Sequence, residues 1–123
     1  MIEYSPIWVV SDVDGTLMDH SYDFTPAKQT IKLLQELEIP VILCTSKTAA
    51  EVKLIRKQLN LTDPYIVENG AAIYGEFLNK ANGEIILGER YEKLEKILSS
   101  ISEEINYHLK PLNKISDQEA TEL

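Results

Sequence analysis

Two aspartates separated by one residue, Asp12 and Asp14, are the side chains whose types and spacing point most clearly to chemistry. They directly follow an apolar segment, residues 7–11, and are followed by Gly15 and Thr16. Two carboxylates this close repel each other, and such a cluster normally persists because a cation or a reaction needs it. The pair therefore indicates a reactive or metal-binding site.

Phosphoryl transfer is the reaction that this set of residues fits, because it needs a nucleophile, a cation and donors around the phosphoryl oxygens. Asp12 can attack phosphorus to form an aspartyl-phosphate, and Asp14 can protonate the leaving oxygen and later activate water. Gly15 lets the backbone turn tightly near the phosphate, and Thr45 offers a hydroxyl donor. Mg²⁺ is the natural cation, because it is a hard ion that accepts carboxylates and keeps several waters.

The strands that would position these residues are predicted from short apolar, β-branched segments. Residues 7–11, 41–44 and 65–67 have this pattern and are expected to be buried strands. A strand–helix–strand–helix–strand order implies a parallel sheet with right-handed crossovers. Ligands of such sheets bind beyond the carboxyl ends of the strands.

Two helices are predicted between these strands. Thr25 is expected as the N-cap of the first helix and Pro26 as its first residue. Thr48 and Glu51 form a capping-box pattern at the start of the second. The inward faces are predicted to carry apolar side chains: Ala27, Ile31, Leu34 and Leu37 in the first helix, and Val52, Ile55 and Leu59 in the second.

Polar groups follow all three predicted strands. Asp12 and Asp14 follow the first, Thr45 and Ser46 follow the second, and residues 68–70 follow the third. Because these strand ends should meet at one edge of the sheet, their convergence is stronger evidence for a site than any single motif.

The pattern changes after residue 70. Residues 71–77 and 84–87 are predicted to form a hairpin, with a turn signal at residues 82–83. Apolar residues at helical spacing then predict a core-facing helix: Tyr91, Leu94, Leu98, Ile101 and Ile105. Ser116 and Glu119 form a second capping-box pattern that opens another helix.

Composition limits the possible partners and locations. The chain has 123 residues, 44% of them hydrophobic, and a formal net charge of −8. The acidic balance disfavours nucleic acid and anionic membranes as partners. Cys44 is the only cysteine, so neither an intrachain disulfide nor a multi-cysteine zinc site is expected. With no signal-peptide pattern and no membrane-spanning apolar run, a cytoplasmic protein is expected.

Simpler explanations exist for the candidate site residues. The aspartate pair could be a polar turn, although the apolar strand before it disfavours this interpretation. A calcium loop is excluded, because its sixth position requires glycine and Leu17 stands there, counting from Asp12. Thr45 could be a strand-end cap and Ser46 could cap the next turn. Lys47 is either a surface charge or a contact to a substrate anion.

The phrase Asp12-Val13-Asp14-Gly15-Thr16 resembles the first signature motif of the haloacid dehalogenase (HAD) phosphatases. The strand at residues 41–44 with the threonine after it resembles the second motif. Within that superfamily, residues 43–48 and 66–74 resemble mannosyl-3-phosphoglycerate phosphatases, which remove a phosphate to make mannosylglycerate.

This resemblance implies a Mg²⁺-dependent phosphomonoester hydrolase acting on a small phosphorylated sugar acid. The first aspartate of the motif would be the nucleophile and the second the proton carrier, and both would bind the metal. The predicted phosphate and substrate contacts are Gly15, Thr16, Thr45, Ser46, Lys47 and Asn69. For Asn69, only the resemblance gives a substrate role, since Asn-Gly is first a turn former.

The implied fold is a HAD-like α/β core with a Rossmann-like parallel sheet and the start of an inserted α+β cap. Residues 1–78 are predicted to be the N-terminal half of that core, and residues 79–123 the beginning of a truncated cap. The lysine and aspartates of the family's third and fourth motifs are not matched. We therefore expect weak or no activity from the isolated chain.

Two alternatives remain. One is a non-catalytic HAD fragment that binds Mg²⁺ or phosphate, self-associates, or binds a complementing C-terminal half. The other is a phosphoacceptor receiver-like signalling domain, for which Lys110-Pro111 is superficially suitable. A receiver needs its acceptor aspartate after the third strand, where this chain has Glu68 and Asn69.

Overall fold

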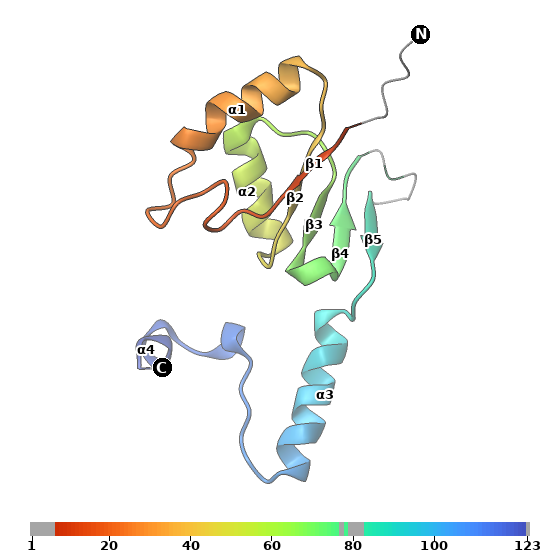
Figure 1. The fold of residues 1–123 in the computed structure, drawn as a ribbon. Helices are drawn as coiled ribbons and strands as arrows, with labels where there is room; N and C mark the ends of the chain where they lie inside the picture. The colour runs from red at the N-terminus through yellow and green to blue at the C-terminus, as the bar shows by residue number, and fades with distance from the viewer. Residues whose placement is uncertain (1–6, 77, 79–82, 123) are drawn as a thin grey trace. The chain divides into compact units, whose positions relative to one another are not determined.

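The computed structural model describes residues 7–76, 78 and 83–122, which form two compact units, Met1–Gly88 and Glu89–Leu123 (Figure 1). Two parts of the predicted hairpin therefore lie outside the described residues. These are Asn82 of the turn and Phe77 at the end of the first predicted strand. The sheet and the candidate site both belong to the first unit.

Five strands form one sheet in the order of the sequence. β1 (Val9–Ser11), β2 (Val41–Cys44) and β3 (Tyr65–Val67) are parallel, and Val9 pairs with Val41 in register. β4 (Ala72–Tyr74) and β5 (Glu84–Ile86) continue the sheet in antiparallel fashion. The predicted α/β fold with a parallel sheet and a following hairpin is confirmed.

β1 differs from the buried strand expected at residues 7–11. It begins at Val9, and its Val10 side chain is 58% exposed. Ile7 and Trp8, which precede the strand, are exposed to a similar degree. In the described part of the chain β1 pairs with β2 alone, which places it at an edge of the sheet. An edge position cannot be deduced from an apolar run, because it depends on which strands pair.

Helix α1 (Thr25–Glu36) starts differently from the prediction. Its N-cap residue is Phe24, so Thr25 is the first helical residue and the predicted Thr25 cap is wrong. The Asp23 carboxylate, one residue before the N-cap, accepts hydrogen bonds from the backbone N–H and the hydroxyl of Thr25, at 2.8 and 2.6 Å. Leu37 lies beyond the helix and is exposed, which corrects its predicted inward position.

Helix α2 (Ala49–Leu59) starts as predicted. The Glu51 backbone N–H donates to the Thr48 hydroxyl, and the Glu51 carboxylate accepts from the Thr48 N–H at 2.9 Å. Val52, Ile55 and Leu59 are buried, so the predicted inward face is confirmed.

A single hydrophobic core holds the first unit together. α1 and α2 lie on the same side of the sheet, and the core includes residues from both (Figure 1). The most deeply buried side chains are Val13, Val41, Leu43, Val52 and Val67. Val13 stands between the two candidate aspartates, so packing of the core fixes the segment that carries them.

The second unit contains α3 (Tyr91–Glu104) and the short α4 (Asp117–Thr121). The capping box of Ser116 and Glu119 is present as predicted. The α3 helix is also confirmed, but its predicted core-facing stripe is wrong, since no residue of α3 is buried. The members Tyr91, Leu94, Ile101 and Ile105 are 42–54% exposed.

The boundary between the two compact units lies after Gly88, because β5 pairs with β4 and so belongs to the sheet. The assignment of residues 79–123 to the beginning of a cap stays a prediction. Among the described helices, none is both long and apolar enough to cross a membrane.

Candidate active site

The segment after β1 forms a tight turn around the Val13 carbonyl. This oxygen accepts hydrogen bonds from three successive backbone N–H groups, those of residues 16–18, at 3.0–3.2 Å. Gly15 has a φ of 70°, a left-handed conformation that glycine adopts without steric cost. With Val13 fully buried, the turn holds the backbone of Asp12 and Asp14 while both residues remain exposed.

The two aspartates have different surroundings. The Asp14 side chain is 47% exposed, and its Oδ1 lies 3.0 Å from Lys47 Nζ. Asp12 forms no side-chain hydrogen bond or ion pair with any residue that the structure describes. An exposed carboxylate with no protein partner is accessible to an electrophile or a cation.

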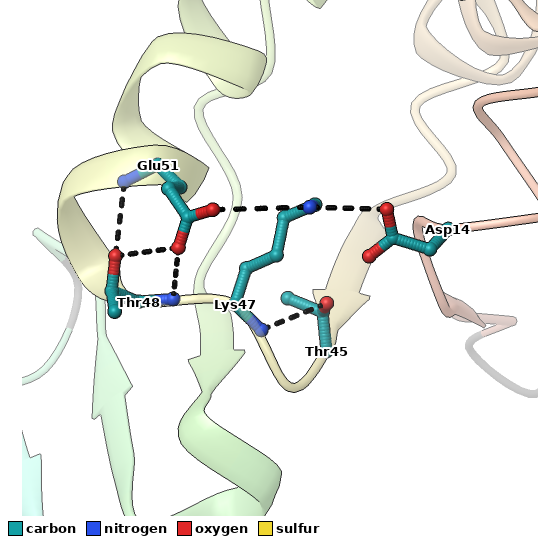
Figure 2. A network of polar contacts seen from close by, with 5 residues as sticks. All are labelled: Asp14, Thr45, Lys47, Thr48 and Glu51. Carbon is teal, nitrogen blue, oxygen red and sulfur yellow. Dashed lines mark hydrogen bonds and ion pairs between the residues drawn. The ribbon is translucent and has the colours of Figure 1, made fainter. Parts of the chain in front are cut away.

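Lys47 joins the two sides of the site. Figure 2 shows its ammonium between the Asp14 carboxylate and the Glu51 carboxylate, at 3.0 and 3.9 Å. The hydrogen bond to Asp14 raises the pKa of Lys47 above its ordinary value, so it is charged at neutral pH. Its side chain is 15% exposed, which corrects the alternative of a solvated surface charge.

Thr45 lies at the end of β2 and is buried. Its hydroxyl oxygen accepts a hydrogen bond from the Lys47 backbone N–H at 3.2 Å (Figure 2). Since that bond uses the oxygen as an acceptor, the hydroxyl proton can still be donated to a bound anion.

The loop after β3, Glu68–Gly70, is fastened to the loop after β2. Asn69 donates its backbone N–H to the Thr45 carbonyl at 3.2 Å, and Glu68 donates to the Lys47 carbonyl at 3.0 Å. Glu68, Asn69 and Gly70 all have positive φ, with values of 51°, 57° and 92°. Left-handed conformations are costly for residues with a Cβ and are held by surrounding structure.

The structure thus brings together most of the predicted site residues. Asp14, Thr45, Lys47 and Asn69 are connected by direct contacts. Asp12, Gly15 and Thr16 belong to the adjoining turn, and Ser46 is exposed in the loop after β2. Direct contacts are thus present for four of the predicted residues, whereas the chemical roles of all of them stay predictions.

The capping-box pattern gives Glu51 only a capping role and does not predict its ion pair with Lys47. The signal was available, because residues four apart on a helix face each other and this pair has that spacing.

The donor groups at this turn are carboxylates, which are ligands that Mg²⁺ accepts. No cluster of three or more His, Cys, Asp or Glu side chains suited to a metal occurs among residues 7–76, 78 and 83–122. Mg²⁺ commonly uses only one or two carboxylates together with waters and substrate phosphate. Asp12 and Asp14 provide two carboxylates of this kind, so the residues present fit a partial Mg²⁺ site.

A family model for haloacid dehalogenase-like hydrolases matches residues 9–117, and the chain belongs to this family. HAD hydrolases generally use Mg²⁺. The family assignment replaces the receiver-like alternative, since it covers the aspartate turn, the Thr45 loop and the hairpin together.

Solved structures show the same fold. A hypothetical protein from Geobacillus kaustophilus has a TM-score of 0.62 and 21% identity, with 81% of this chain and 38% of that chain covered. A haloacid dehalogenase-like hydrolase from Bacillus subtilis has a TM-score of 0.58 and 22% identity, with 80% of this chain and 34% of that chain covered. A haloacid dehalogenase-like hydrolase from Bacteroides thetaiotaomicron has a TM-score of 0.64 and 16% identity, with 80% of this chain and 38% of that chain covered. The chain therefore spans between 34% and 38% of the length of these three structures.

Proposed function

We propose that this chain carries the nucleophile half of a Mg²⁺-dependent phosphomonoester hydrolase. The observation that carries the proposal is the arrangement at the end of β1, where Asp12 is exposed with no partner among the described residues and Asp14 is paired with Lys47. The family to which the chain belongs supports the same class of reaction.

Asp12 would be the nucleophile. One of its carboxylate oxygens forms a bond to phosphorus as the bond from phosphorus to the ester oxygen breaks. Asp14, protonated in the substrate complex, would pass its proton to the ester oxygen, and the alcohol would leave. Asp14 then removes a proton from water as the water oxygen attacks phosphorus and the bond from phosphorus to the Asp12 oxygen breaks, which releases inorganic phosphate and restores the Asp12 carboxylate.

The contact with Lys47 would leave Asp14 able to transfer these protons. Its ammonium contacts Oδ1, and Oδ2 forms no hydrogen bond or ion pair with any residue that the structure describes. The free oxygen can therefore carry the transferred proton while Oδ1 is held in place.

Phosphate oxygens would be bound by donors from two loops. These are the Thr45 hydroxyl, the backbone around Gly15 and Thr16, and the Asn69 and Ser46 side chains. Asp12 and Asp14 would hold Mg²⁺, which supplies positive charge that offsets the charge of the phosphoryl group.

The finer proposal concerns the substrate. Residues 43–48 and 66–74, which resemble mannosyl-3-phosphoglycerate phosphatases, form the loops that meet at Thr45 and Asn69. We therefore propose mannosyl-3-phosphoglycerate, a small phosphorylated sugar acid, as substrate.

The test is release of inorganic phosphate from mannosyl-3-phosphoglycerate by the 123-residue chain with Mg²⁺, beside an Asp12→Asn variant. We expect weak release that the substitution and chelation of Mg²⁺ both abolish. Release that persists unchanged in Asp12→Asn would exclude Asp12 as the nucleophile.

A second candidate is a non-catalytic HAD fragment that self-associates or binds a complementing C-terminal half. The observation that favours it is the edge position of β1, where Ile7, Trp8 and Val10 are all exposed. A strand edge with exposed apolar side chains is a surface that another strand can cover.

A further inference from the structure

A small pocket adjoins the Asp14–Lys47 pair. Its volume is about 250 Å³, slightly below the range of about 300–1,000 Å³ typical of drug-sized ligands, so it suits a single ring. Met18, Phe24, Leu54 and Ile55 provide apolar walls. Lys47 is also a lining residue, and its ammonium lies 3.0 Å from Asp14. Lys47 therefore lines the pocket and also contacts Asp14, the proposed proton carrier.

Tyr22 lines this pocket although it is 74% exposed. Its φ of 61° is left-handed, which is uncommon for a bulky residue and is maintained only by surrounding contacts. Those contacts centre on Asp19, whose Oδ1 accepts hydrogen bonds from the Ser21 N–H, the Ser21 hydroxyl and the Asp23 N–H at 2.7–3.0 Å. The loop thus places Tyr22 at the pocket at a conformational cost.

The charges at the pocket limit what it can accept. The Lys47 ammonium is already shared by the Asp14 and Glu51 carboxylates, so these three groups sum to one negative charge. A second anion would be repelled, whereas hydroxyl groups could donate to Glu51 and exchange hydrogen bonds with the Gln58 amide, which also line the pocket.

We propose that this pocket binds the neutral, hydroxyl-bearing ring of the substrate's leaving group, with one ring face against Tyr22 and the hydroxyls toward Glu51 and Gln58. A sugar ring has this chemistry, because its C–H groups form an apolar face and its hydroxyls lie around the rim. This assignment rests on the proposed function and places part of substrate selection in the first unit.

The test uses methyl α-mannoside, a neutral sugar ring without phosphate, and saturation-transfer NMR on the 123-residue chain. Tyr22→Ala removes the proposed ring contact, and Tyr22→Phe keeps it. Tyr107→Ala is the matched control, because Tyr107 is another exposed tyrosine and lies in the second unit. Glycerate serves as the anionic probe.

We expect saturation transfer to one face of the mannoside ring that falls at least severalfold in Tyr22→Ala and persists in Tyr22→Phe and Tyr107→Ala. Glycerate should not displace the mannoside. Equal transfer in Tyr22→Ala, no transfer with the unaltered chain, or displacement by glycerate would each overturn the assignment. Because the readout needs neither Mg²⁺ nor phosphoryl transfer, its failure is separate from failure of the proposed function.

Discussion

Lys47 is the residue whose position changes the interpretation of the site most. From the sequence it could have been a surface charge, yet its ammonium lies between two carboxylates from different segments. Such a contact depends on the packing of the β1 turn against the start of α2, which no local pattern encodes. Asp12, Asp14 and Thr45 could be located from sequence because each follows a strand directly.

Lys47→Met should strengthen Mg²⁺ binding at the aspartate pair. The ammonium at Asp14 opposes a second cation, and partly exposed pairs of this kind contribute about 0.2–1 kcal/mol. Removing it should lower the Mg²⁺ dissociation constant by up to about fivefold, by the conversion of free energy to affinity. An NMR titration following the backbone amides of residues 12–16 measures this directly.

Lys57→Met is the control for that titration, since Lys57 is an exposed lysine of α2 away from the aspartate pair. It should leave the dissociation constant close to that of the unaltered chain. Unchanged or weaker Mg²⁺ binding in Lys47→Met would show that the ammonium does not compete with the metal.

At the scale of elements, the two capping boxes offer a matched comparison. Thr48→Ala should lower the free energy of unfolding by about 1 kcal/mol, because α2 buries three side chains in the core. Ser116→Ala removes the same type of cap from the five-residue α4, which buries none, and should have a much smaller effect. Chemical denaturation followed by circular dichroism measures both, and equal losses would contradict the argument.

The Thr48 cap should also depend on pH. Hydrogen bonds from Thr48 hold the pKa of Glu51 below its ordinary value of 4.5. A carboxyl whose folded pKa is lowered contributes stability above its unfolded pKa and loses it as pH falls through the folded pKa. The stability difference between the unaltered chain and Thr48→Ala should therefore shrink below about pH 4.5, and a difference that grows in acid would be inconsistent with these bonds.

The sequence predicted these elements unevenly, for identifiable reasons. β2, β3, α2 and both capping boxes follow local patterns and were predicted correctly. The start of α1 was not, because its N-cap is Phe24, a residue type that is not among the preferred caps.

At the scale of the whole molecule, exposed apolar surface is the feature that the sequence could not reveal. A periodic apolar stripe looks the same whether or not something covers it, so α3 was expected to be buried. For the same reason, the apolar residues of β1 suggested an interior strand, although strand order places β1 at an edge.

This exposure predicts self-association through the β1 edge. Val10→Lys should reduce it, because a lysine on an edge strand disfavours pairing with another strand. Sedimentation velocity over a range of concentrations should show a lower average mass for this variant. Leu33→Lys, which changes an exposed leucine of α1, should have a smaller effect, and equal shifts would indicate nonspecific apolar contact.

The central claim is that Asp12 is a phosphoryl acceptor, and trapping the phosphoenzyme tests it most directly. The chain would be mixed with Mg²⁺ and mannosyl-3-phosphoglycerate, quenched in acid, and analysed by peptide mass spectrometry. We predict one phosphoryl group on the peptide containing Asp12, absent in Asp12→Asn and retained in Asp117→Asn, which changes an exposed aspartate of α4. A phosphoryl group that persists in Asp12→Asn, or no adduct at saturating substrate, would contradict the claim.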